Sequence, residues 1–198
     1  MQIKNLALFA ATAAALPAAS TDELIHNNDA FNLIAIKSGS GVQNSGIKAS
    51  GGYFYIGAAS QNASCDSTDA SNTATFYLSN DNAYLYTASA RAPQQLWVDR
   101  SGMGKGIWGY TTGAQAAGRN SERTPWTINA QSQLLFDGAS PAACPQKTPA
   151  GVVLPGEWSV WWDKASDNPG NNYGDCIDIT LKAVKVDKPV GCHYTEAS

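Results

Sequence analysis

Apolar residues along this chain occur in short runs with a two-residue period, and polar clusters separate the runs. Glycine, asparagine, serine and proline dominate these clusters and favour turns. No stretch beyond residue 30 keeps the 3.6-residue period of a helix. The pattern therefore predicts an all-β chain of about ten short antiparallel strands. The expected strands cover residues 31–37, 47–57, 75–78, 83–87, 95–99, 106–112, 125–129, 133–138, 157–163 and 176–186.

Three turn clusters each separate two of these strands and predict a hairpin; they cover residues 79–82, 100–105 and 130–132. The pair Gly51-Gly52 predicts a bulge or bend inside the second strand. The apolar phase of the last strand changes at Val184, which also indicates a bulge. Residues 31–198 are expected to form one compact domain, a β-sandwich or a barrel, with a β-trefoil-like barrel as the alternative.

The N-terminal segment has the features of a secretory signal peptide. Lys4 supplies a positive charge, residues 6–16 are apolar, and small residues follow as cleavage sites. We therefore expect a signal peptide over residues 1–19, followed by a polar arm over residues 20–30. The apolar run is too short to span a membrane, and the C-terminal residues show no signal for a lipid anchor.

The four cysteines are Cys65, Cys144, Cys176 and Cys192. An even number in a secreted chain predicts two disulfides, and all three pairings remain open. The sequence Asn62-Ala63-Ser64 is an acceptor for N-linked glycosylation, which places Asn62 in an exposed loop.

The charge of the chain excludes several classes of partner. Charged residues make up 15% of the chain and the net charge is −3. A nucleic-acid-binding protein needs a basic surface, and adhesion to anionic lipid needs clustered lysine and arginine. We expect no nucleic-acid partner and no membrane contact, and we expect a monomer.

The segment EWSVWWDK, residues 157–164, contains three tryptophans in five positions. On a strand, Trp158 and Trp162 share one apolar face with Val160, which predicts that they lie in the core. Trp161 and Asp163 share the other, mixed face. These two residues are candidate sugar contacts, and the alternative is that Trp161 packs beneath a loop.

No catalytic site follows from the sequence. A serine triad needs a rigidly held histidine, and neither His26 nor His193 lies in such a position. A glycosidase needs two carboxylates that flank a sugar cleft. Candidates are Asp99, Glu122, Asp137, Glu157, Asp163, Asp175 and Asp178. Residues 163–175 are rich in oxygen ligands but lack the spacing of a calcium loop, so we expect no metal and no cofactor.

Three blocks resemble a known fungal family: FNLIAIKSGSGVQNSGIKASGGYFYIG, LWVDRSGMGKGIWGYTTG and CIDITLKAVKVDKPVGCHYTE. In these blocks the chain is similar to the PhiA-type cell wall proteins of filamentous ascomycetes, from about residue 31 to residue 194. The resemblance implies a secreted, glycosylated protein of the cell wall without a lipid anchor. It also implies a link to phialide and conidium formation, and some members are allergens. No catalytic residue is carried over from the family.

These observations predict a secreted, non-enzymatic structural or interaction protein of the fungal cell wall that acts in asexual spore development. Its expected partners are wall polysaccharide or other wall proteins. The alternative is a secreted carbohydrate-binding or carbohydrate-active protein. A secreted toxin or effector would share the same cysteine pattern.

Overall fold

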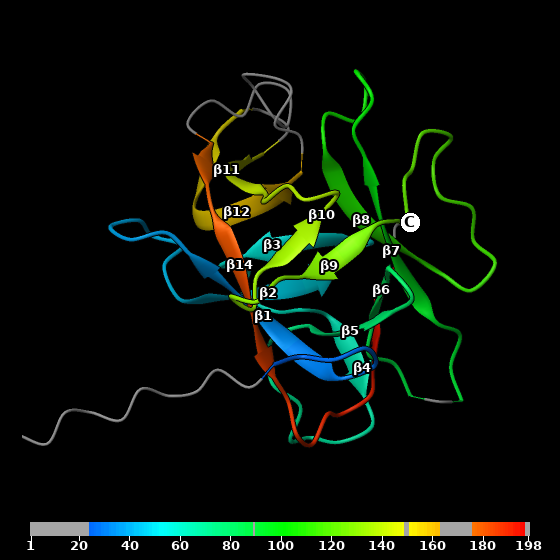
Figure 1. Ribbon diagram of the computed structural model, residues 1–198. Helices are drawn as coiled ribbons and strands as arrows, with labels where there is room; N and C mark the ends of the chain where they lie inside the picture. The colour runs from blue at the N-terminus through cyan, green and yellow to red at the C-terminus, as the bar shows by residue number, and fades with distance from the viewer. Residues whose placement is uncertain (1–23, 89, 149–150, 163–175, 197–198) are drawn as a thin grey trace, which may run out of the picture.

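The computed structural model describes residues 24–88, 90–148, 151–162 and 176–196. The described residues form fifteen strands and no helix, and antiparallel pairing connects the strands (Figure 1). The strands are β1 (Ala30–Ile36), β2 (Ser45–Ser50), β3 (Tyr53–Ile56), β4 (Ala63–Cys65), β5 (Thr75–Ser79), β6 (Asn82–Leu85), β7 (Gln94–Asp99), β8 (Ile107–Thr112), β9 (Trp126–Ile128), β10 (Leu134–Phe136), β11 (Ala142–Lys147), β12 (Val153–Trp161), β13 (Ile177–Asp178), β14 (Thr180–Lys185) and β15 (Cys192–Tyr194). The predicted all-β class is therefore confirmed.

Eleven strands form one large sheet, with the order β13-β11-β12-β3-β2-β1-β5-β6-β7-β8 and with β14 beside β1. The strand β8 is the last in this order, and it also pairs with β3 and β12, which stand near the other end. These pairings connect the two ends of the strand order. The remaining strands form two small sheets, β9–β10 and β4–β15. No helix in the described part of the chain is long and apolar enough to cross a membrane. The expected signal peptide, residues 1–19, lies outside the described residues, as do residues 20–23 of the arm.

The three predicted hairpins are confirmed as β5–β6, β7–β8 and β9–β10. The single strand expected over residues 47–57 is wrong, because β2 and β3 form a fourth hairpin. Gly51 and Gly52 are its two turn residues, with φ of +57° and +82°. A two-residue turn of this kind needs positive φ at both positions, which glycine adopts without strain.

Residues 141–156 are rich in proline, yet they contain β11 and the start of β12. The first residues of β11 are buried and pair with β12 on one side and with β13 on the other. The register between β11 and β12 shifts between Pro145 and Lys147. A proline fits at such an irregularity because it has no N–H to donate to the ladder. Tertiary pairing therefore overrides the turn signal of this composition.

The bulge expected at Val184 is also wrong. The β1–β14 register runs without a break from Phe31 opposite Lys185 to Ile36 opposite Thr180. Val184 keeps the strand's alternation and is 44% exposed instead of shifting toward the core. In the strand β1, one face is buried and the other is partly exposed. Its residues Phe31, Leu33 and Ala35 are buried, whereas the alternate residues are half-buried.

Both expected disulfides are present, and the fold sets their pairing. Cys65 pairs with Cys192, which joins β4 to β15, although the two residues are 127 positions apart. Cys144 of β11 pairs with Cys176, which directly precedes β13. Each bridge links a short peripheral strand to its neighbour.

Candidate functional site

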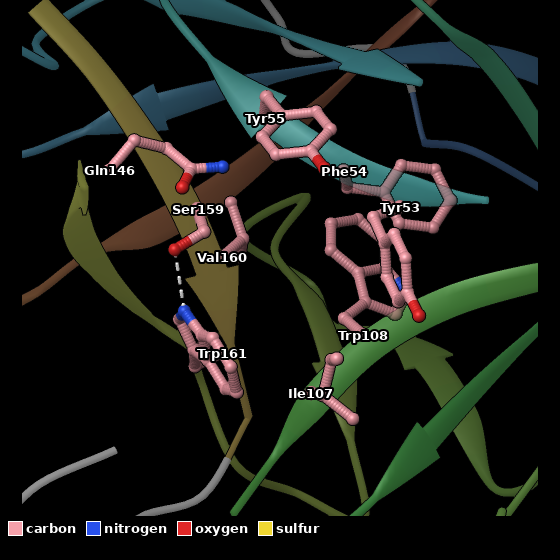
Figure 2. A pocket seen from close by; sticks show the side chains of 9 residues that line it. All are labelled: Tyr53, Phe54, Tyr55, Ile107, Trp108, Gln146, Ser159, Val160 and Trp161. Atoms are coloured by element: carbon pink, nitrogen blue, oxygen red, sulfur yellow. Dashed lines mark hydrogen bonds between the residues drawn. The ribbon is translucent and has the colours of Figure 1, made fainter. Parts of the chain in front are cut away.

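The candidate site lies where three strands of the large sheet meet. β12 pairs with β3 through Ser159 opposite Tyr55. Beyond this point both strands pair with β8, through Trp161 opposite Ile107 on one side and Tyr53 opposite Gly109 on the other. Strands β3 and β12 therefore separate around the start of β8. A pocket of about 230 Å³ opens there (Figure 2).

Aromatic and uncharged polar side chains line this pocket. Its nine lining residues are Tyr53, Phe54, Tyr55, Ile107, Trp108, Gln146, Ser159, Val160 and Trp161. Figure 2 shows Tyr55, Gln146 and Trp161 around the space between β3 and β12. None of the nine carries a charge. The pocket therefore matches an uncharged ligand that offers both apolar surface and hydrogen-bonding groups.

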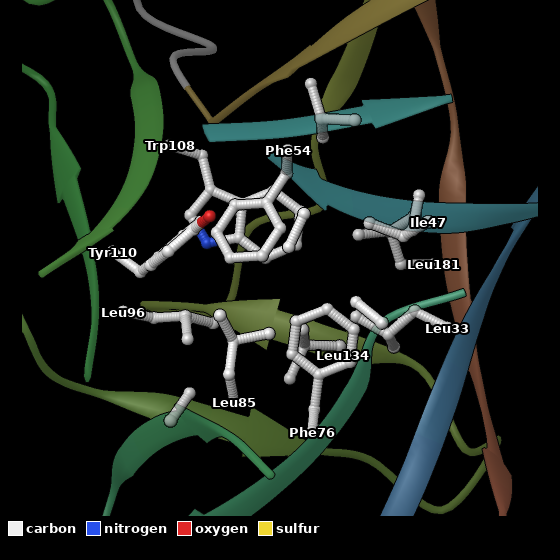
Figure 3. Packing of buried hydrophobic residues seen from close by; sticks show 14 of the residues in the cluster. Leu33, Ile47, Phe54, Phe76, Leu85, Leu96, Trp108, Tyr110, Leu134 and Leu181 are labelled. Carbon is white, nitrogen blue, oxygen red and sulfur yellow. The ribbon is translucent and has the colours of Figure 1, made fainter. Parts of the chain in front are cut away.

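The floor of the pocket belongs to the hydrophobic core. Phe54 and Trp108 are both buried, and their stacked rings have centroids 3.9 Å apart (Figure 3). Trp108 also meets Trp162 edge to face at 5.7 Å, and Trp162 meets Trp126 in the same way at 5.0 Å. Interlocked aromatic rings of this kind hold one packing arrangement. The pocket therefore stands on a rigid base.

A hydrogen bond fixes the orientation of Trp161 on the pocket wall. The indole Nε1 of Trp161 donates to Oγ of Ser159 over 2.7 Å (Figure 2). The same hydroxyl donates to the carbonyl oxygen of Cys144 over 3.3 Å. The polar edge of the indole is thus satisfied within β12. The ring is partly exposed and forms part of the pocket lining.

The predicted division of the tryptophans is confirmed for Trp161 and Trp162. Trp162 is 1% exposed and Val160 is also buried, while Trp161 lies on the opposite face and is partly exposed. Trp158 was also predicted to lie in the core, but it is only half-buried and packs against the edge of the core. The first residues of β12 are largely exposed, so the core ends near this position.

Two sequence candidates, Asp163 and Asp175, lie outside the described residues, as does the whole segment considered as a calcium loop, residues 163–175. Among the described residues, no group of three or more histidine, cysteine, aspartate or glutamate side chains is placed to hold a metal ion. Asn62 lies at the surface, as expected. Its Nδ2 donates to Oγ of Ser50 over 3.0 Å.

Arg100 brings two of the seven carboxylate candidates together. Its guanidinium donates to Glu122 through Nε over 3.0 Å and to Asp137 through Nη1 over 3.0 Å. The guanidinium also lies over the ring of Phe136, 5.0 Å from its centroid. The hydrogen bond to Glu122 is the largest of the effects that raise the pKa of Arg100. This cluster ties β7 to the loop before β9 and to the end of β10.

Sequence reasoning identified Trp161 but missed its partners in the pocket. Tyr53 and Tyr55 face outward because they alternate with buried Phe54 and Ile56. That alternation is visible in the sequence YFYI. The sequence alone did not show that this strand lies beside β12, since about 100 residues separate the two in the chain.

Comparison with known proteins agrees with the family resemblance. The family of PhiA-like secreted proteins matches residues 31–195. The cell wall protein phiA of Aspergillus niger is 48% identical over 195 residues, which cover 98% of this chain and 99% of that protein. The cell wall protein phiA of Aspergillus fumigatus is 44% identical over 196 residues, which cover 99% and 100% of the two chains.

The cell wall protein phiA of Emericella nidulans is 41% identical over 197 residues, with coverage of 98% and 100%. No solved structure matches the chain. The expected localisation, secreted and in the cell wall, agrees with the family and with these relatives. A family match over residues 31–195 and these identities over nearly the full length place the chain without ambiguity: it belongs to the family of PhiA-like secreted proteins.

Proposed function

We propose that this protein is a non-enzymatic structural protein of the fungal cell wall that holds to wall polysaccharide without a covalent bond. We further propose that it acts in the formation of phialides and conidia. The relatives named as cell wall proteins support the location. The resemblance of the three sequence blocks to the PhiA-type family is the basis for the developmental role.

The observation that carries the binding role is the uncharged aromatic pocket between β3, β8 and β12. A pyranose ring presents C–H groups on its faces and hydroxyl groups around its edge. Trp161, Tyr53 and Tyr55 offer apolar ring faces, and Gln146 and Ser159 offer an amide and a hydroxyl. A pocket with this composition suits a neutral sugar better than an acidic or basic ligand.

A binding assay with insoluble wall polymers tests this role. We expect the purified protein to sediment with insoluble glucan or chitin, and Trp161→Ala to weaken binding about fivefold to tenfold. Tyr84→Ala is the matched control. Tyr84 is a partly exposed aromatic residue on the outward face of β6, stacked on Tyr77 and outside the pocket. Failure of the wild-type protein to bind either polymer would refute the polysaccharide role and leave other wall proteins as the partner.

The non-enzymatic character is tested in the same mixtures. We expect no release of reducing sugar during prolonged incubation with glucan or chitin. Release that disappears in Glu122→Gln or Asp137→Asn would instead identify a carbohydrate-active enzyme using the pair of carboxylates around Arg100.

The developmental role can be tested only in the living fungus, with a deletion strain and complementation. We expect a deletion strain to form fewer normal phialides and conidia, and the wild-type chain to restore them. Complementation with Trp161→Ala asks whether the pocket is needed. Full rescue by that variant would separate the developmental role from polysaccharide binding at this pocket.

A further inference from the structure

Beside the pocket, the outer face of the sheet extends from β3 across β8 to β7, and outward-facing residues of these three strands lie next to one another. The β7–β8 register places Trp97 opposite Gly109, and the β3–β8 register places Gly109 opposite Tyr53. Trp97, Gly109 and Tyr53 therefore form one row across three strands. Since Tyr53 also lines the pocket, this row and the pocket are continuous.

The alternation of each strand shows that these aromatic residues face outward. Leu96 and Val98 are 0% exposed, so Trp97 between them lies on the outer face of β7. Tyr53 precedes buried Phe54 and lies on the outer face of β3 in the same way. The rings of Trp97 and Tyr53 meet edge to face, with centroids 6.4 Å apart and planes at 73°.

Gly109 allows the indole of Trp97 to lie across β8. A Cβ atom at position 109 would be 2.6 Å from Cζ2 of Trp97 and 2.8 Å from the carbonyl oxygen of Gly52. Any other residue at this position would push the indole away from the sheet. The glycine therefore keeps Trp97 low over the strand and partly exposed. The row is a shallow aromatic surface instead of a set of projecting side chains.

We propose that the pocket and the Trp97 row form one extended binding surface for a linear, uncharged polysaccharide chain. Trp161 and Tyr55 contact one part of the chain, and Trp97 contacts a part further along. This proposal rests on the proposed function and adds the length and charge of the ligand. Trp97, Tyr53, Tyr55, Trp161, Gln146 and Ser159 are all uncharged, which favours a neutral polymer such as glucan or chitin over a charged one.

The dimensions of the site explain why the ligand is a chain. At about 230 Å³, the pocket is smaller than a typical drug-sized site of roughly 300–1,000 Å³, so it accommodates only a short piece of sugar. Trp97 lies outside the pocket lining and is reached only by a ligand that extends beyond Tyr53. Contacts made by one molecule at both places reinforce each other, so affinity rises with chain length.

A length series of oligosaccharides tests this proposal. Binding of soluble glucan and chitin oligosaccharides, from two to eight sugars, is measured by calorimetry for the intact secreted protein. We expect affinity to rise with length for one of the two polymers, which also identifies the polymer. Trp97→Leu should weaken the longest oligosaccharide about fivefold to tenfold and leave the disaccharide unchanged. Trp161→Ala should weaken both.

The choice of leucine keeps an apolar cover over Gly109 while removing the aromatic face, so Trp97→Leu is expected to stay folded. Tyr84→Ala is the control and should change neither affinity. Equal affinity of Trp97→Leu and wild type for the longest oligosaccharide would overturn the extended surface and leave the proposed function intact. Absence of binding by the wild type at every length would overturn both.

Discussion

The side-chain amide of Gln94 pairs with the backbone of Tyr194 as a neighbouring strand would. Its Nε2 donates to the carbonyl oxygen of Tyr194 over 2.9 Å, and its Oε1 accepts from the N–H of Tyr194 over 2.9 Å. Gln94 is 0% exposed. These two bonds hold the C-terminal strand β15 against the start of β7, 100 residues earlier in the chain.

Gln94→Leu should therefore destabilise the protein strongly. The change leaves the buried N–H and carbonyl of Tyr194 without partners, which costs about 2–4 kcal/mol in the free energy of unfolding. Gln95→Leu is the control, because Gln95 is half-exposed and water can replace its bonds to Asn82 and Arg123. Its cost should stay below about 1 kcal/mol. Equal losses in denaturant unfolding would show that the buried amide pairing is unimportant.

The tryptophans of β12 should differ in their contribution to stability. Trp162 lies in the aromatic core, so Trp162→Ala should lower the free energy of unfolding by about 3–5 kcal/mol. Trp161→Ala should cost clearly less because that ring is partly exposed, and Trp158→Ala should fall between the two. Thermal or denaturant unfolding measures all three. Similar costs for Trp161 and Trp162 would mean that both faces of the strand are covered.

The two disulfides should differ in their effect on stability. Peptide mapping without reduction should recover Cys65 linked to Cys192 and Cys144 linked to Cys176, with no free thiol. The first bridge closes a loop of 127 residues and the second one of 32. By loop entropy, removing the first pair by alanine substitution should cost about 1 kcal/mol more than removing the second. A larger loss for the second pair would contradict this entropic argument.

Asn62 should carry a glycan when the protein is secreted from a eukaryotic cell. Its side chain is exposed, directly before β4, and its Nδ2 donates a hydrogen bond to Oγ of Ser50. Glycosidase treatment should lower the mass of the protein, and Ser64→Ala should abolish the change by removing the acceptor motif. An unmodified Asn62 in the wild-type protein would refute this prediction.

Stability should fall at alkaline pH because two buried tyrosines resist ionisation. Burial raises the pKa of Tyr194 to about 12, and burial also raises the pKa of Tyr110. In the unfolded chain a tyrosine has a pKa of about 10. Above pH 10 the unfolded state releases these protons first, so the free energy of unfolding decreases up to about pH 12.

Denaturant unfolding between pH 8 and pH 12 measures this loss, and Tyr194→Phe should reduce its slope. The variant also removes the hydrogen bond that the backbone N–H of Thr75 donates to the Tyr194 hydroxyl. It should therefore be less stable than wild type at neutral pH. An unchanged alkaline slope in this variant would contradict the role of Tyr194.

Local pattern was sufficient for the features that depend on neighbouring residues. The two-residue period predicted most strands, including the one over residues 95–99, because alternation is a property of each strand alone. It also placed Trp161 and Trp162 on opposite faces. The even cysteine count indicated two disulfides, since that argument depends only on composition and compartment.

Strand pairing decided the features that local pattern could not. β11 contains Pro145 and short apolar residues, and it becomes a strand only because β12 and β13 supply partners for its backbone groups. The pairing of Cys65 with Cys192 follows from the β4–β15 ladder, in which the two residues stand opposite each other. The local sequence of a strand does not determine which distant strand will pair with it.

Strand pairing also explains why the residues of the candidate site lie together. The sequence by itself determined that Trp161 and Trp162 lie on opposite faces of their strand. Only the tertiary structure decided that Trp161 shares one surface with the outward-facing aromatic residues of β3 and β7, because β3 and β12 separate where β8 joins both. Outward direction depends on the period of a single strand, whereas proximity depends on the register between strands that are far apart in the chain.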